Sequence, residues 1–96
     1  PKRIETLLAL SRTPQTSRDL QAKGISSGDV NYYVGRVDAE KRASADAKAK
    51  RGVDGYKYVS FIGDGLVEID ASVRPATFLL TPKGVEYQEA LRAIIK

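Results

Sequence analysis

The sequence predicts an α+β fold that is mainly helical, with a small antiparallel β-sheet of two or three strands late in the chain. Apolar residues recur at helical spacing between positions 4 and 37. They alternate with polar residues around positions 66–70, as in a strand, and a last run from position 82 returns to helical spacing. With 96 residues the chain has the length of one small domain, so we expect a single unit over 1–96 with a basic insertion at about 38–55.

The first helix is expected at residues 3–12. Its apolar face at helical spacing consists of Ile4, Leu7, Leu8 and Ser11. The triplet Thr13-Pro14-Gln15 then breaks the helix, because proline cannot continue it.

A second helix follows at residues 17–23. Thr16 is its N-cap and Asp19 completes a capping-box pattern, while Gly24 suits the left-handed conformation that ends helices. Ile25 follows as a buried turn residue. Two short helices joined by a tight glycine-containing turn form the helix-turn-helix pattern.

The third helix starts near Ser27, where Ser26 is the cap and Asp29 follows three residues later. One face carries the apolar positions Val30, Tyr33, Val34 and Val37. The opposite, exposed face carries Gly28, Asn31, Tyr32, Gly35 and Arg36. We therefore expect a polar, aromatic and basic surface on this helix.

The middle of the chain leaves two questions open. Residues 38–51 hold strong helix formers without a large apolar side chain, so they either continue the third helix or form a separate solvated helix, with Gly52 and Gly55 at its end. Residues 56–62 combine alternation with aromatic residues, which suits a strand leading to a turn at 63–65, but a short helix is almost as plausible.

The end of the chain predicts a hairpin and a closing helix. Residues 66–70 and 77–80 are the two strands, joined by a connection at 71–76. Thr81 is the N-cap of the last helix, and Pro82 stands at its first position, where a missing N–H costs nothing.

The residue types that are missing argue against an enzyme. The chain contains neither cysteine nor histidine, which excludes thiol catalysis and cysteine-ligated zinc and removes the usual proton shuttle. The carboxylates are scattered, and even Asp64, Glu68 and Asp70 are a poor basis for a magnesium site. We expect a binding module that is not an enzyme and needs neither a metal ion nor another cofactor.

The positive charge is concentrated in one segment. Lysine and arginine number 16 against 12 acidic residues, a net charge of +4. Residues 41–51 contain five basic residues and one carboxylate, Asp46, so the net charge of this segment equals that of the whole chain. Such a segment could neutralise the phosphates of a nucleic acid. The same composition is also found in a solvated helix whose charges only keep the protein soluble.

Hydropathy predicts where the protein resides. No run approaches the roughly 20 apolar residues of a membrane span, and the first residues lack the apolar core of a signal peptide. We expect a cytoplasmic protein, associated with the nucleoid or a plasmid, that has no membrane partner.

The order of three helices, a hairpin and a closing helix resembles the winged helix-turn-helix domain of MarR-like and PadR-like regulators. Val30-Asn31-Tyr32-Tyr33-Val34-Gly35-Arg36 resembles the recognition helix, and Gly65-Leu66-Val67-Glu68 resembles the opening of the first wing strand. Phe78-Leu79-Leu80-Thr81-Pro82-Lys83-Gly84 resembles the second wing strand and the start of the dimerisation helix. The resemblance covers 3–37 and 65–96.

The segment 38–64 departs from these families, which need only a few residues between recognition helix and wing. Because they place a short helical stretch before the Gly-Leu-Val-Glu segment, the resemblance favours a helix over 56–62. In size and simplicity the chain is also similar to small archaeal plasmid partition proteins with a PadR-like fold, which bind a centromere-like site and spread along DNA.

A helix-turn-helix places its second helix in the major groove of double-stranded DNA, with the preceding helix across the backbone. The candidate DNA-contacting residues are Thr16, Ser17, Arg18, Ser26, Ser27, Asn31, Tyr32, Arg36, Lys41, Arg42, Lys48, Lys50, Arg51, Ser72 and Arg74. Asn31 would pair with adenine, Arg36 with guanine or a phosphate, and Arg74 would enter the minor groove. Thr16 to Arg18 would hold a phosphate at the helix start.

The last helix predicts a homodimer, because twofold DNA sites match twofold proteins. The candidate interface consists of Ile4, Leu8, Tyr87, Leu91, Ile94 and Ile95. The same stripe could instead pack on the domain's own core.

The expected function is sequence-specific binding of double-stranded DNA by a dimeric transcriptional regulator. A plasmid partition protein that assembles further along DNA is the alternative within the same class. A winged-helix adaptor that binds proteins instead of DNA is the alternative from another class.

Overall fold

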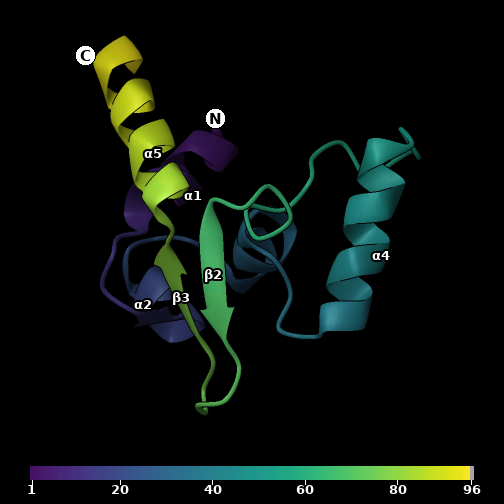
Figure 1. Ribbon diagram of the computed structural model, residues 1–96, viewed down its shortest axis with the longest axis horizontal. Coiled ribbons are helices and arrows are strands. Elements are labelled where there is room, and N and C mark those ends of the chain that lie inside the picture. Colours follow the sequence, from purple (N-terminus) through teal and green to yellow (C-terminus); the bar gives the residue numbers. More distant parts are fainter. Residues whose placement is uncertain (96) are drawn as a thin grey trace.

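The computed structural model describes residues 1–95 and contains helices together with one small sheet (Figure 1). In chain order the elements are α1 (Lys2–Ala9), β1 (Gln15–Thr16), α2 (Ser17–Ala22), α3 (Ser27–Asp29), the π-helical turn η1 (Val30–Val34), α4 (Ala39–Lys50), β2 (Val67–Asp70), β3 (Thr77–Leu80) and α5 (Pro82–Ile95). The protein is therefore α+β with an antiparallel sheet, as the sequence predicts.

The sheet has three strands in the order β1-β3-β2. Strands β2 and β3 form the expected hairpin, in which Val67 pairs with Leu80 and Ile69 with Phe78. The short strand β1 adds to the other edge of β3, where Gln15 pairs with Phe78. In the sequence, residues 13–15 had only the character of a break, because two residues are too few for a strand pattern to be visible.

The core lies between the first helices, the sheet and the segment before β2. Its buried apolar side chains are Leu7, Leu10, Leu20, Ile25, Val30, Val34, Phe61, Leu66, Val67, Phe78 and Leu80. Helix α5 is tied to the end of α1 by Gln88, whose buried amide donates hydrogen bonds to the carbonyls of Leu7 (2.9 Å) and Leu10 (2.8 Å). The end of α5 projects beyond this body (Figure 1).

The predicted helix caps are confirmed. Thr16 and Asp19 form a reciprocal capping box on α2, and Ser26 accepts a hydrogen bond from the Asp29 amide at the start of α3. Thr81 accepts from the Gly84 amide at the start of α5. These caps depend only on residues three positions apart, which is why the sequence shows them.

Two predicted helix ends are wrong. Helix α1 ends at Ala9, so Ser11 lies beyond it. The third helix ends at Val34, because Gly35 takes a φ of +138°, which turns the chain out of the helix. Gly35 is buried instead of exposed, Arg36 lies after the helix, and Val37 is 53% exposed instead of facing the core.

The segment 56–62 forms neither the favoured helix nor a strand. Its backbone hydrogen bonds go to the end of η1: the Phe61 amide donates to the Tyr33 carbonyl (2.7 Å) and the Ile62 amide to the Val34 carbonyl (3.1 Å). A hydrogen-bonded turn over 61–65 then leads into β2. The segment closes the end of the third helix, a role that local periodicity does not reveal.

Residues 38–51 resolve the first open question in favour of a separate helix. Asp38 caps α4 by accepting from the Lys41 amide (2.9 Å), and none of the helix's residues is buried. In Figure 1 α4 stands beside the body, with long connections at both ends. None of the helices over residues 1–95 is both long and apolar enough to cross a membrane.

Candidate nucleic-acid interface

The turn that joins α2 to α3 is held by a local hydrogen bond. The amide of Ile25 donates to the Leu20 carbonyl (3.1 Å), and both side chains are buried. The caps of the two helices lie on either side of this turn. Because the turn is anchored in the core, α3 has one orientation relative to α2.

The start of α2 and the hairpin lie next to each other. Thr16, Ser17 and Arg18 line an open cleft of about 320 Å³ together with Val37 and with Pro75 and Ala76 of the hairpin. The structure thus brings the α2 candidates together with the neighbourhood of Arg74, which precedes Pro75. Figure 1 shows the hairpin loop projecting at the lower edge of the molecule, where α2 also lies.

The start of α2 is not an open anion site. The Thr16 hydroxyl already accepts from the Asp19 amide (3.1 Å), and the Asp19 carboxylate accepts from the Thr16 amide (2.9 Å). These hydrogen bonds lower the pKa of Asp19, so its negative charge persists beside the helix start. A phosphate contact at this point therefore depends on the side chains of Ser17 and Arg18.

The hairpin loop presents Arg74 as an exposed side chain, whereas Ser72 is engaged inside the loop. Both the amide and the hydroxyl of Ser72 donate to the Asp70 carboxylate, which lowers the pKa of Asp70. Ser26 is likewise engaged, as the cap of α3. Of these three predicted contacts, Arg74 is the one whose polar group has no partner within residues 1–95.

The polar face of α3 and η1 lies opposite α4. Asn31, Tyr32 and Arg36 line a cleft of about 200 Å³ with Arg42 and Asp46 on its far side. The Tyr32 hydroxyl is engaged by the segment after α4, since it donates to the Gly55 carbonyl and accepts from the Lys57 amide. The structure therefore brings Asn31, Tyr32 and Arg36 together as expected, but next to a helix that sequence reasoning did not place there.

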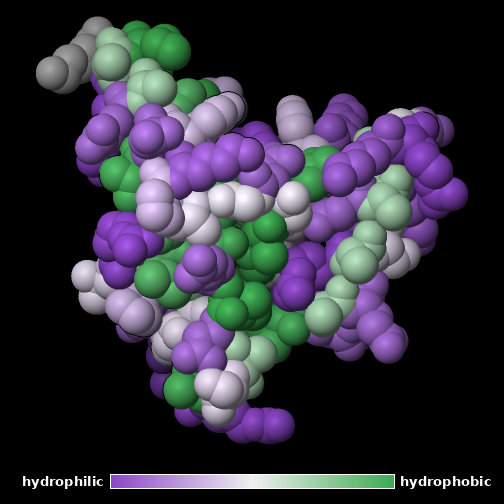
Figure 2. Space-filling model, viewed as in Figure 1, coloured by the Kyte–Doolittle hydropathy of each residue, from purple (hydrophilic) through white to green (hydrophobic). Residues whose placement is uncertain are grey.

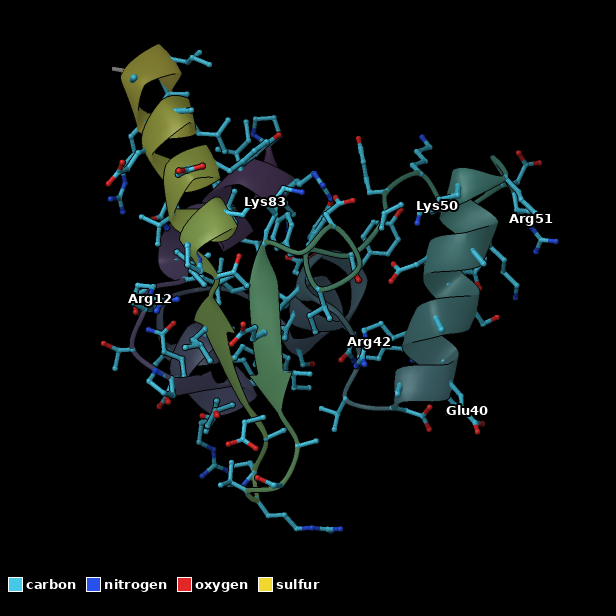
Figure 3. The ribbon with its side chains drawn as sticks, viewed as in Figure 1. Arg12, Glu40, Arg42, Lys50, Arg51 and Lys83 are labelled. Atoms are coloured by element: carbon cyan, nitrogen blue, oxygen red, sulfur yellow. The ribbon has the colours of Figure 1, made fainter. Side chains whose placement is uncertain are left out.

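The basic side chains of α4 do not share a face. Positions 41 and 48 are seven residues apart and lie on one side, while Lys50 lies on nearly the opposite side. Figure 3 shows Arg42 toward the body and Arg51 pointing away from it. The Arg42 guanidinium donates to the Arg36 carbonyl (2.6 Å), and Lys48 lies 5.1 Å from the centre of the Tyr56 ring.

Helix α4 is attached to the body by Asp46, a residue that the sequence showed only as the exception within the basic run. Its carboxylate accepts hydrogen bonds from the amide (2.7 Å) and the hydroxyl (3.0 Å) of Ser60, which is buried. A side chain at position 63 would collide with this carboxylate, so Gly63 makes the approach possible.

The candidate cations on the outer surface are free of acidic partners. Salt bridges within residues 1–95 join Lys2 to Asp29 and Arg3 to Asp64, and none involves Arg18, Arg36 or Arg74. These three arginines can therefore pair with phosphates without first breaking an ion pair.

The predicted dimer residues fall into three places. Ile4, Tyr87 and Leu91 line one pocket of about 140 Å³ between α1 and α5, while Leu8 lies in a different pocket with Lys23 and Ile25. Ile94 (77% exposed) and Ile95 lie on the projecting end of α5, where Figure 2 shows apolar atoms at the surface. Leu91 packs against the core, so that part of the stripe serves the domain itself.

Comparison of the chain with protein-family models, curated proteins and solved structures gives no match in any of the three.

Proposed function

We propose that the protein binds double-stranded DNA through a winged helix-turn-helix surface. The observation that carries this proposal is the meeting of α2 and the β2–β3 hairpin at one cleft, with Arg18 and Arg74 beside it and free of acidic partners. The element order, in which β1 separates α1 from α2 and pairs with the hairpin, supports the same interpretation.

In the proposed docking, the exposed start of α3 enters the major groove and the hairpin reaches the minor groove, while α4 lies beside η1 at the edge of the contact. Ser27 and Asn31 contact base edges. Arg18 binds a phosphate beside them, Arg36 binds a guanine or a phosphate, and Arg74 enters the minor groove. The basic residues of α4 are spread around the helix and attract the phosphates of the DNA backbone. This attraction does not depend on the DNA sequence, because phosphate contacts carry no sequence information.

The proposal includes a homodimer formed through the projecting end of α5. Ile94 and Ile95 expose apolar surface that the domain itself does not cover. Replacing Ile94 with aspartate should shift sedimentation from a dimer to a monomer without changing the circular dichroism spectrum. A monomeric starting protein, or a variant that stays dimeric, would contradict this interface.

A salt titration of binding to duplex DNA tests the proposed function. If Arg18, Arg36 and Arg74 of each protomer each neutralise the charge of one phosphate, a dimer neutralises at least six. The logarithm of the affinity should then fall with the logarithm of the salt concentration at a slope of about −5 or steeper, because the cations of α4 add to it. Replacing Arg18 with alanine removes two contacts per dimer and should make the slope less steep by about two. Arg92 on α5 provides the matched control, and its replacement should leave the slope unchanged.

Two further variants test the docking mode. Arg36→Ala should weaken specific binding most, whereas Lys48→Ala should weaken binding to every sequence alike. Negligible losses for both Arg36→Ala and Arg74→Ala would refute the docking, and a flat salt slope would favour a protein-binding adaptor. A footprint that stops at one site would support a transcriptional regulator, while one that grows with protein concentration would support a partition protein.

A further inference from the structure

The cleft between η1 and α4 is lined by aromatic rings that are partly open to solvent. Tyr32, Tyr56 and Tyr58 contribute to its wall, and Tyr32 and Tyr58 are 37% and 46% exposed. The rings of Tyr32 and Tyr58 stand at 90° with centroids 6.4 Å apart, and Tyr33 supports both from below at 4.9 and 6.2 Å. The Arg3 guanidinium already lies 5.1 Å from the centre of the Tyr58 ring, and Lys48 lies 5.1 Å from that of Tyr56. The exposed surface that remains on Tyr32 and Tyr58 is where a planar group can stack.

The same cleft contains hydrogen-bond donors that nothing in the chain uses. Arg42 donates from one nitrogen to the Arg36 carbonyl, and its other N–H groups have no partner within residues 1–95. The Arg36 guanidinium and the Asn31 amide make no hydrogen bond or ion pair within the same residues. The cleft therefore offers two guanidinium groups and an amide.

The one acidic residue that lines the cleft leaves a net charge of +1 there, because Arg36 and Arg42 carry two positive charges against one carboxylate. Asp46 is the carboxylate that lines it, and both of its oxygens accept hydrogen bonds from Ser60. The chemistry that fits is a flat ring that stacks on tyrosine, together with an anionic group that pairs with arginine. Aromatic side chains combined with cations are also how proteins bind unpaired nucleotides.

We propose that this cleft binds a nucleotide. The base stacks on the exposed tyrosine rings, the Asn31 amide pairs with the edge of the base, and the phosphate pairs with Arg36 and Arg42. The volume of about 200 Å³ is below the roughly 300–1,000 Å³ of pockets that enclose drug-sized ligands, so the base enters and the phosphate stays at the open mouth.

This inference goes beyond the proposed function, because a duplex keeps its bases stacked and paired. The nucleotide comes either from the free pool or from an unpaired stretch of nucleic acid, and the chemistry of recognition is the same for both. Because the cleft includes the polar face of α3 and η1, a bound nucleotide would also hold α4 in place over that face.

Isothermal titration calorimetry on the full chain tests the proposal with adenosine monophosphate and cytidine monophosphate as probes. Adenosine and cytidine, which lack the phosphate, should bind at least about tenfold more weakly, because they cannot use the guanidinium groups. Arg36→Gln should reduce the affinity for each monophosphate towards that of its nucleoside, because one of the two guanidinium groups that pair with the phosphate is lost. Arg92→Gln, on α5 and away from the cleft, should leave the affinity unchanged.

A second pair of variants tests the rings. Tyr58→Leu should weaken binding of both nucleosides and nucleotides about tenfold, while Tyr87→Leu, a similarly exposed tyrosine on α5, should not. Amide chemical-shift changes on adding a monophosphate should fall within residues 28–36 and 42–60. Shifts located elsewhere would overturn the assignment even if binding were measured.

Two arms distinguish the source of the nucleotide. A short single-stranded oligonucleotide that binds at least tenfold more tightly than the monophosphates, with the same loss in Tyr58→Leu, identifies nucleic acid. Equal affinities identify the free nucleotide. The absence of binding by both the monophosphates and the oligonucleotide overturns the inference. Duplex binding is measured separately, so its loss would refute the proposed function while nucleotide binding still stood.

Discussion

Removing the Asp46 carboxylate should release α4 while the rest of the domain stays folded. The helix buries none of its residues, and its contacts with the body are polar. Because an isolated helix of this length is only marginally stable in water, α4 depends on its attachment. Asp46→Ala removes both hydrogen bonds to Ser60 and introduces the residue with the highest helix propensity, so any loss of order reports on the attachment.

The size of the effect follows from the two hydrogen bonds. Hydrogen bonds to charged groups contribute about 1.5–3 kcal/mol each, and competition from water at a partly buried site places the pair near the lower end, about 3 kcal/mol in total. Amide hydrogen exchange within α4 should then become roughly a hundredfold faster. The Asp46 carboxylate contacts the body at Ser60 and beside Gly63, both in the segment before β2, so exchange in α1, α2 and the sheet should stay close to that of the original protein.

Hydrogen exchange measured by mass spectrometry on peptides covering 39–50 is the appropriate assay. Asp54→Asn is the matched control, because Asp54 is exposed and its carboxylate makes no hydrogen bond or ion pair within residues 1–95. A uniform acceleration across the chain would refute the reasoning, since it would mean that Asp46 stabilises the whole domain. Unchanged exchange in α4 would refute it as well, since the helix would then need no attachment.

Two further predictions concern pH and packing. Backbone hydrogen bonds lower the pKa of Asp19 and Asp38 below the ordinary value of 3.8, so their ionised forms stabilise α2 and α4 above that pH, and this stabilisation disappears as the pH falls through the lower folded values. Circular dichroism in acid should show helix loss that Asp38→Asn reduces. Gly84→Ala should lower the melting temperature by more than about 10 °C, because the new methyl group overlaps the Leu66 carbonyl oxygen. Gly28→Ala should not, because its methyl group meets only the Ser26 hydroxyl, at 3.8 Å. A neutral Gly84→Ala would disprove the close approach.

Part of the candidate site follows from sequence patterns alone, because the interactions are local. The caps at Thr16, Ser26 and Thr81 each involve a residue three positions away, and the alternation of β2 and β3 reflects one buried face. The basic segment was visible for the same reason, since charge can be counted along the chain. DNA binding remains a proposal, supported by the arrangement of these parts.

The errors arise where distant segments meet. Val37 has the right spacing for the core, but it lies past Gly35, where the chain turns out of the helix. Ile62 and Arg42 pack so close to Gly35 that a side chain would not fit there. Residues 56–62 look like a strand or a helix, and instead their amides bond to the end of η1.

The sequence by itself determined the order of the first helices, the hairpin, the caps and the position of the charge, because each depends on neighbours within a few residues. Only the tertiary structure decided where α4 lies. Within residues 41–51, Asp46 is the one carboxylate among five basic residues. Its partner Ser60 lies 14 residues further along the chain, beyond Gly52 and Gly55. That contact turns the polar face of the third helix from an open surface into one wall of a cleft, which no periodicity in the sequence reveals.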